Sequence, residues 1–96
     1  MRRGRRVTTD NAVIMVFDRQ VREPGRFGFV VAKTVGGAVT RNRVRRRLRA
    51  VCRDLLPIVP EGTDVVIRVL PGCDRAAWAT LQSEIAEGVS MRVTKG

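Results

Sequence analysis

The chain has 96 residues, of which 19 are Lys or Arg and 9 are Asp or Glu, so its net charge is +10. This length supplies one modest hydrophobic core, and we expect a single domain over residues 1–96. No apolar run approaches the roughly 18 residues of a membrane-spanning helix, and a chain with no His and only two Cys lacks the ligands of the common zinc sites.

The positive charge is concentrated in the first half of the chain. Residues 1–53 carry a net charge of +12, whereas residues 54–96 carry −2. Of the 19 basic residues, 17 are Arg, whose planar guanidinium pairs well with phosphate. This asymmetry indicates a nucleic acid or an anionic membrane as the partner, and a basic domain without such a partner is the plainer alternative.

The first half of the chain predicts short β-strands. Residues 11–18 and 26–33 are rich in β-branched and aromatic side chains, and the turn-forming RQVREPG lies between them. We expect these two runs to form a β-hairpin, with a further short strand at residues 6–9. The three phenylalanines are Phe17, Phe27 and Phe29, and at least two of them should be core residues. The remaining one is available to stack on a base if one face of the sheet is left open.

A helix is predicted from Val39 to Leu56, after Gly36 and Gly37 interrupt the strand pattern. Its apolar positions recur at i, i+4, i+7, i+8 and i+11, which is helical spacing. Thr40 is a candidate N-cap, but no Glu or Gln follows it at the third position, so the pattern leaves the start of the helix open by several residues. The prolines that follow end the helix. The expected buried stripe consists of Val44, Leu48, Val51, Cys52 and Leu55.

The second half predicts one strand and one helix. The nearly unbroken apolar run of residues 63–70 is typical of a central strand covered on both faces, from which Arg68 must reach an edge or a partner. Asp74 is the expected cap of a last helix, whose apolar side carries Trp78, Leu81, Ile85 and Val89. The order of elements predicts an α+β fold in which a small sheet of three or four strands packs against two helices.

The arginines of the central helix are sorted onto one side. At 100° per residue, the positions 42, 45, 46, 49 and 53 form a stripe on the exposed side. Arg43 and Arg47 flank this stripe, and Arg41 joins it only from the first helical turn. Like charges at i, i+4 repel, and Asp54 alone is near enough to relieve them, so we expect an anionic partner. Lys33 projects toward the same region from a strand end.

The sequence offers no catalytic or metal-binding constellation. There is no His, no Ser or Cys beside a base, and the acidic residues are dispersed. Few aromatic residues are available for base-specific contacts, so recognition of backbone and shape is expected. Cys52 falls on the apolar side of its helix and no secretory signal is visible, which favours a reduced cytoplasmic protein.

The segment AVTRNRVRRRLR, preceded by FGFVVAKTVGG and followed by AVCRDLL, resembles the signature of the bacterial ribonuclease P protein subunit. The resemblance covers residues 11 to about 90. It implies a ribosomal protein S5 domain 2-like fold, in which the strand–helix–strand crossover is left-handed. The general rule for parallel strands would predict the opposite hand.

The resemblance also implies a function. The family subunit assists a catalytic RNA that removes the 5′ leader from precursor tRNA, so its partners would be this RNA and the precursor with its leader, and not DNA or a membrane. The RNA and its Mg²⁺ ions, held mainly by RNA, perform the chemistry, and no cofactor is expected on the protein alone. The basic helix and the preceding loop would face the catalytic RNA, and an open sheet cleft would hold the leader. The expected RNA-binding residues are Lys33, Arg41, Asn42, Arg43, Arg45, Arg46 and Arg49, with Arg53 on the same stripe.

Two departures from the family pattern are visible. The family begins with a further helix that helps to wall the leader cleft, and this chain is expected to lack it. Gly37 stands where many relatives carry Asn. The alternative function is a general structural RNA-binding protein, such as a ribosomal protein or an RNA chaperone. A membrane-surface helix is disfavoured, because a domain this small needs the apolar stripe for its core.

Overall fold

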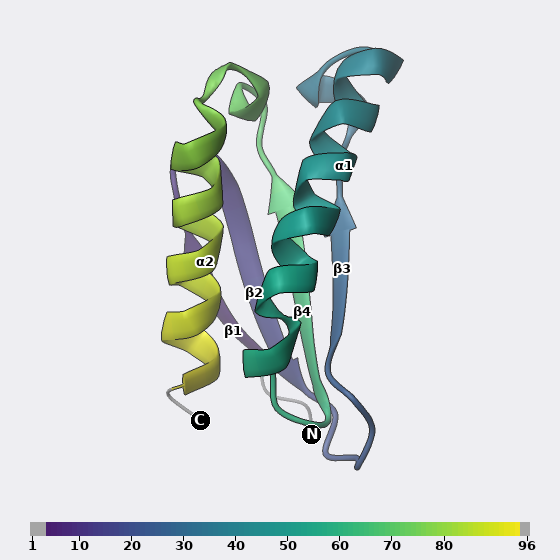
Figure 1. Cartoon of the computed structure of the whole chain (residues 1–96), viewed down its shortest axis with the longest axis vertical. Helices are drawn as coiled ribbons and strands as arrows, with labels where there is room; N and C mark the ends of the chain where they lie inside the picture. The colour runs from purple at the N-terminus through teal and green to yellow at the C-terminus, as the bar shows by residue number, and fades with distance from the viewer. Residues whose placement is uncertain (1–3, 95–96) are drawn as a thin grey trace.

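A computed structural model describes residues 4–94, which form a four-stranded mixed sheet with two helices on one face (Figure 1). The predicted α+β class is confirmed. The strands and helices are, in chain order, β1 (Gly4–Thr8), β2 (Ala12–Asp18), β3 (Arg26–Val30), α1 (Ala38–Leu55), β4 (Thr63–Val69) and α2 (Trp78–Thr94). Three short 3-10 turns connect them, namely η1 (Lys33–Val35), η2 (Leu56–Ile58) and η3 (Cys73–Arg75).

The strand order is β1-β2-β4-β3, so β4 lies between β2 and β3. β4 pairs antiparallel with β2 and parallel with β3, and its Ile67 lies opposite both Ile14 and Phe29. The predicted hairpin of residues 11–18 and 26–33 is therefore wrong, and β2 forms its hairpin with β1 instead. The strongly apolar β4 takes the central position, where neighbours on both edges pair with it. The predicted strand at 26–33 ends at Val30.

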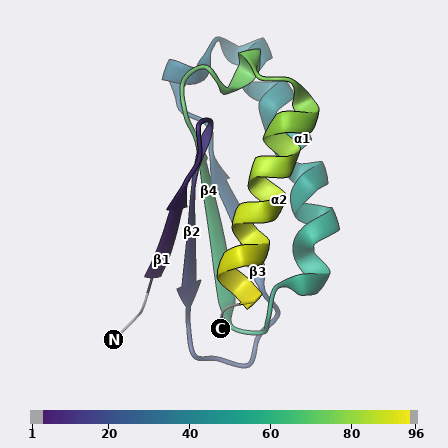
Figure 2. The same ribbon diagram turned by 90° about the vertical axis from the view of Figure 1, so that its left-hand side faces the viewer.

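The connection from β3 through α1 to β4 is left-handed, as the family resemblance implies. In Figure 1 both strands point upward, α1 descends in front of the sheet, and β4 lies to the left of β3. Figure 2 places both helices on the same side of the sheet. A crossover that passes in front and moves to the left has the hand that parallel connections rarely adopt.

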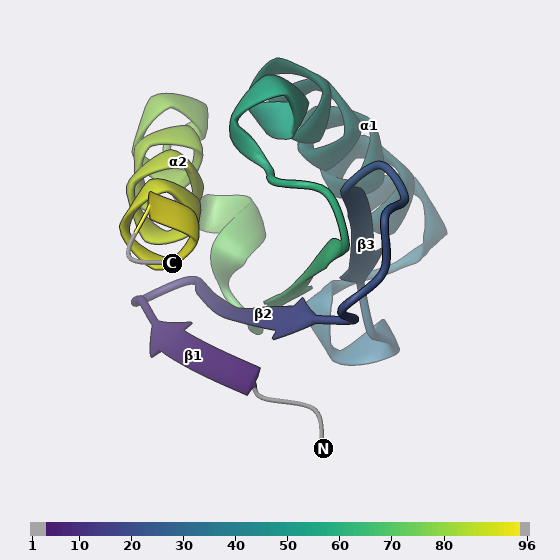
Figure 3. The same cartoon turned by 90° about the horizontal axis from the view of Figure 1, so that it is seen from below.

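The core lies between the sheet and the two helices (Figure 3). β2 and β4 bury alternate side chains toward the helices, and Val66 and Arg68 point to the other face, half-buried and exposed respectively. The prediction that both faces of this strand are covered is wrong, because the helices lie on one face only. The buried hydrophobic residues of the strands and α2 are Ala12, Ile14, Val16, Val65, Ile67, Val69, Leu81, Ile85 and Val89.

Both predicted helix caps are wrong. Thr40 lies inside α1, and the N-cap is Gly37, whose carbonyl accepts a 2.9 Å hydrogen bond from the Arg41 amide. A Cβ at Gly37 would meet nothing within 4 Å, so the structure does not require glycine there for lack of space. Asp74 lies in η3, four residues before α2 begins, because the chain turns at Gly72 (φ 96°) and crosses to the helix layer.

Glu84 joins α2 to the turn between β1 and β2. Its carboxylate accepts hydrogen bonds from the Asn11 amide at 3.2 Å and from Asn11 Nδ2 at 2.7 Å. Burial by itself raises the pKa of Glu84, but the hydrogen bonds from Thr9 and Asn11 together outweigh it, and the pKa lies below its ordinary value.

Because the pKa of Glu84 is lower in the folded protein, the stabilisation that its carboxylate provides depends on pH. The ionised carboxylate stabilises the fold above the ordinary pKa of 4.5, and this stabilisation is lost as the pH falls through the lower folded value. We expect Glu84→Gln to lower the thermal unfolding midpoint at pH 7, and the difference from wild type to shrink as the pH falls below 4.5. A difference that does not change with pH would contradict this role.

Candidate nucleic-acid interface

The side of α1 that faces away from the core carries most of its arginines. Val44, Leu48, Val51 and Cys52 are buried against the sheet and α2. This division between an apolar and a basic side agrees with the helical-wheel prediction, except that Arg45 and Leu55 are half-buried and Arg43, predicted at the flank, is exposed. The exposed basic stripe, as we call it below, consists of Asn42, Arg43, Arg46, Arg49 and Arg53, with the half-buried Arg45 beside it.

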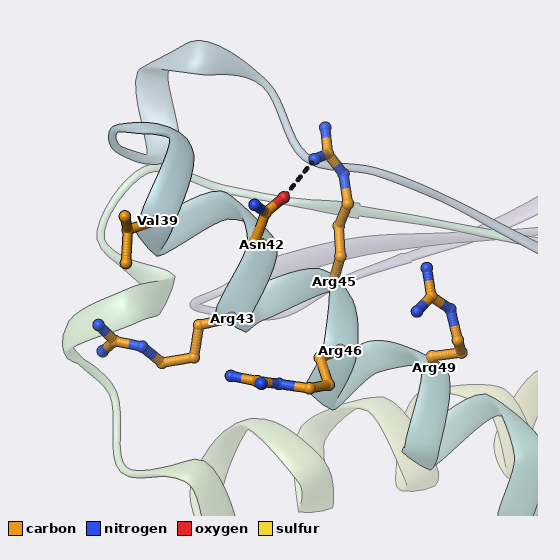
Figure 4. Close-up of a pocket in the computed structure, with 6 residues that line it drawn as sticks. All are labelled: Val39, Asn42, Arg43, Arg45, Arg46 and Arg49. Atoms are coloured by element: carbon orange, nitrogen blue, oxygen red, sulfur yellow. Dashed lines mark hydrogen bonds between the residues drawn. The ribbon is translucent and has the colours of Figure 1, made fainter.

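The first turns of the basic stripe surround a shallow hollow of about 410 Å³ (Figure 4). Arg43 and Arg46 extend in the same direction from the helix, and the guanidinium of Arg45 donates a 3.2 Å hydrogen bond to Asn42 Oδ1. No carboxylate lines this hollow, so it concentrates positive charge and suits an anion such as phosphate. The lining residues are Val39, Asn42, Arg43, Arg45, Arg46 and Arg49.

Three of the predicted RNA-binding residues do not line this hollow. Arg41 lies in the first turn of α1 and is half-buried, Lys33 is exposed in η1, and Arg53 lies further along the helix. Lys33 was expected at a strand end, but the strand stops earlier. The other predicted residues all line the hollow, because an 18-residue helix repeats one face over many turns. They are Asn42, Arg43, Arg45, Arg46 and Arg49.

No ion pair in the described part of the chain includes a residue of the basic stripe. Arg19 contacts Glu23 at 2.7 Å and Asp64 at 2.8 Å, and Arg26 contacts Asp64 at 3.1 Å. The hydrogen bond from Arg26 is the main cause that lowers the pKa of Asp64. Among residues 4–94, no arginine of α1 forms an ion pair, so the charge of the stripe is not neutralised internally.

Arg47 contributes to packing between the helices. Its guanidinium carbon lies 5.5 Å from the centre of the Trp78 ring, a cation–π contact that joins α1 to α2. Arg47 is half-buried and does not line the hollow of the basic stripe. It therefore differs from its neighbour Arg46, which is exposed.

Arg47 and Arg46 form a matched pair for separating stability from binding. We expect Arg47→Gln to lower the free energy of unfolding by about 0.5–1 kcal/mol, because the cation–π contact is lost. Arg46→Gln should leave stability within about 0.5 kcal/mol of wild type. Thermal unfolding of both variants checks this difference. Equal stability of the two would argue against the contact with Trp78.

The sheet face opposite the helices is uncovered over the described residues. β2 presents Val13, Met15 and Phe17 there, and Met15 and Phe17 line a hollow of about 240 Å³ with Arg5 and Arg6. Phe27 and Phe29, in contrast, pack against the core on the helix side, which confirms that two of the three phenylalanines are core-facing. Sequence reasoning did not assign these open-face residues, because every position of β2 except its last is apolar and alternation does not distinguish its two faces.

Neither cysteine lines the hollow of the basic stripe. Cys52 and Cys73 are buried and free, and burial raises the pKa of the Cys52 thiol to about 11. Within residues 4–94, no group of three His, Cys, Asp or Glu side chains is placed to hold a metal ion. No helix in that range is long and apolar enough to cross a membrane.

Comparison with known proteins gives consistent matches in sequence and fold. The chain is 56% identical over 93 residues to the ribonuclease P protein component of Clavibacter michiganensis subsp. michiganensis, a match that covers 97% of this chain and 82% of the relative. It is 48% identical over 95 residues to that of Rhodococcus jostii, covering 93% and 76%.

The fold also matches solved structures. The RNase P protein of Staphylococcus aureus aligns with a TM-score of 0.81 at 18% identity, covering 93% of this chain and 81% of that chain. That of Thermotoga maritima, solved in complex with 1-(4-fluorophenyl)-2-thiourea, aligns with a TM-score of 0.76 at 22% identity, covering 88% and 81%. A family model described as Ribonuclease P matches residues 1–92. With its basic helix and uncovered sheet face, the chain thus belongs to the ribonuclease P protein family.

Proposed function

We propose that this protein is the RNA-binding subunit of ribonuclease P and assists a catalytic RNA in removing the 5′ leader from precursor tRNA. The observation that carries the proposal is the basic stripe of α1, whose arginines are exposed and form no ion pair among the described residues. Phosphates of the catalytic RNA neutralise this charge when the complex forms. Family membership supports the choice of RNA.

The uncovered sheet face is the proposed binding surface for the precursor leader. Its apolar strip of Val13, Met15 and Phe17 on β2 offers a surface on which unpaired bases stack. Arg6 and Arg68 are exposed on the same face and supply contacts for phosphate. Leader and catalytic RNA thus occupy different elements, the leader on the sheet and the RNA along α1.

The chemistry in this proposal belongs to the RNA. Mg²⁺ prefers oxygen ligands and is commonly bound through phosphates, so we assign the ions mainly to the RNA. The protein's part is to bring positive charge to two polyanions that repel each other. It acts in the cytoplasm, where the two free, buried cysteines stay reduced.

Reconstitution tests the proposal. The chain is added to a ribonuclease P RNA at low Mg²⁺, and cleavage of a precursor tRNA is measured with and without the protein. We expect the protein to stimulate cleavage, and a precursor with its leader shortened to one nucleotide to gain less. Absence of stimulation, together with no binding of the wild-type protein to the RNA, would reject the proposed function.

A competition assay separates this function from a general RNA chaperone or ribosomal protein. Labelled catalytic RNA is displaced from the protein by unlabelled catalytic RNA or by an unrelated RNA of equal length. If the protein is a subunit of ribonuclease P, displacement should require much more of the unrelated RNA than of the catalytic RNA. A protein that makes phosphate contacts alone would not distinguish the two RNAs. Equal displacement by both would favour the general RNA-binding protein.

A further inference from the structure

A second hollow lies between β3 and the C-terminal half of α1, and the function proposed above assigns no ligand to it. Its volume is about 460 Å³, within the range of small-molecule sites. We call it the β3–α1 groove. It is lined by Gly25, Arg26, Phe27, Phe29, Arg49, Cys52, Arg53 and Leu56.

The groove offers aromatic surface that the core leaves partly exposed. Phe27 and Phe29 lie opposite the buried Val65 and Ile67 on β4, so they are on the helix side of the sheet, yet both stay half-buried. Leu56 extends the apolar surface and is 46% exposed. Two rings beside an exposed leucine form a surface on which a flat ligand can stack.

The groove carries positive charge and no lining carboxylate. Arg49 and Arg53 are exposed and, within the described part of the chain, make no hydrogen bond or ion pair. Arg26 is held by Asp64 through two hydrogen bonds, at 3.1 and 3.2 Å, so it is the least available of the three. Aromatic rings bordered by free guanidinium groups favour a ligand that is planar in one part and anionic in another.

From this arrangement we infer that the β3–α1 groove holds an unpaired nucleobase of the RNA that lies along α1, with a neighbouring phosphate on Arg49 or Arg53. This inference rests on the proposed function and adds a contact to it. Arg49 lines both this groove and the hollow of the basic stripe, so the two sites are continuous. A strand that follows the stripe therefore reaches Phe27 and Phe29 with its next nucleotides.

An acidic peptide would satisfy the arginines but would leave the stacking surface without a flat partner. The nucleobase uses both features, because bases stack on aromatic side chains and their phosphates pair with Arg. The contact is independent of base identity, since every base has a π-face. The inference accordingly concerns position and not sequence preference.

Photocrosslinking tests the contact directly. Catalytic RNA containing 5-iodouridine, which couples to aromatic side chains on irradiation, is bound to the wild-type protein, and the adducts are mapped by mass spectrometry. We expect an adduct on Phe27 or Phe29. Adducts confined to Phe17 or Trp78, or none at all on a complex that forms normally, would overturn the inference and leave the proposed function standing.

Binding by variants gives a second measurement. Phe29→Leu keeps an apolar side chain but removes the ring, so we expect at least fivefold weaker binding to the catalytic RNA with an unchanged salt dependence. Arg53→Gln should instead reduce the slope of log K against log salt by about one contact. Leu56→Ala and Ile58→Ala are matched, because both residues are exposed in η2 and only Leu56 lines the groove. Only the first should weaken binding.

These outcomes separate the groove from the basic stripe. If Arg46→Gln weakens binding while Phe29→Leu, shown to be folded by circular dichroism, binds like wild type, the groove inference fails alone. If Phe29→Leu does not fold, the groove inference is tested by the crosslink and by the comparison of Leu56→Ala with Ile58→Ala. A polyglutamate peptide tests the alternative occupant. If it displaces the RNA equally well from wild type and from Phe29 variants, and no iodouridine adduct forms in the groove, the groove is assigned to an acidic protein partner.

Discussion

Replacing Arg43, Arg46 and Arg49 together by glutamine should weaken binding to the catalytic RNA by about a hundredfold at near-physiological salt, while the fold stays intact. Each phosphate contact contributes a slope of about −0.7 to −0.9 in log K against log salt, which corresponds to about fivefold per contact at this salt. All three side chains are exposed and make no ion pair within residues 4–94, so their loss removes no internal partner.

The measurement is a salt titration of the affinity for the catalytic RNA. The slope for the triple variant should be smaller than that of wild type by about two to three. Arg22→Gln is the control for net charge, since Arg22 is exposed in the loop between β2 and β3, at the opposite end of the molecule from the start of α1 (Figure 1). An equal loss per charge in the control and the triple variant would mean that net charge, and not the stripe, determines binding.

Gly62→Ala should lower the free energy of unfolding by about 3 kcal/mol or more. Gly62 has a φ of 76°, which costs a residue with a Cβ about 1–2 kcal/mol. A Cβ there would also overlap the backbone carbonyl oxygen of Val21, which cannot turn away as a side chain can. The Gly62 amide donates to the Glu23 carbonyl, and its own carbonyl accepts from the Arg19 amide, both at 2.7 Å. The alanine thus disturbs the contact that fixes the β2–β3 loop against the start of β4.

Gly72 supplies the matched control for this substitution. Its φ is 96°, but a Cβ there would meet nothing within 4 Å. Gly72→Ala should therefore cost only the backbone strain of about 1–2 kcal/mol. For a domain of this size, each kcal/mol shifts the thermal midpoint by about 4–8 °C, so a scan of the two variants resolves the difference. Equal midpoints would show that the loop moves to accommodate the methyl group.

The basic stripe illustrates what periodicity determines by itself. A helix repeats every 3.6 residues whatever it packs against, so the positions of Val44 and Leu48 place the arginines on the other side of α1 before any tertiary contact is known. The same local information placed the end of the helix to within one residue of Leu55, whereas the candidate cap at Thr40 placed its start too late. Motif resemblance then supplied the family and the hand of the crossover, neither of which follows from spacing.

Pairing between strands depended on contacts that the local sequence does not contain. Residues 11–18 and 26–33 are adjacent in the chain and look like a hairpin, but β4 separates them because its long apolar run is paired on both edges. The caps at Thr40 and Asp74 failed for a related reason, since the path of the chain between layers decides where a helix starts.

The two surfaces beyond the stripe were decided by the tertiary structure alone. Phe17 and Phe29 lie in similar apolar strands, yet one faces the uncovered side of the sheet and the other faces the helices. The β3–α1 groove requires residues from two elements whose distance apart only packing determines. Local spacing therefore fixed which side of the helix is charged, because a helix is periodic on its own, whereas the neighbours of each strand followed from pairing between distant segments.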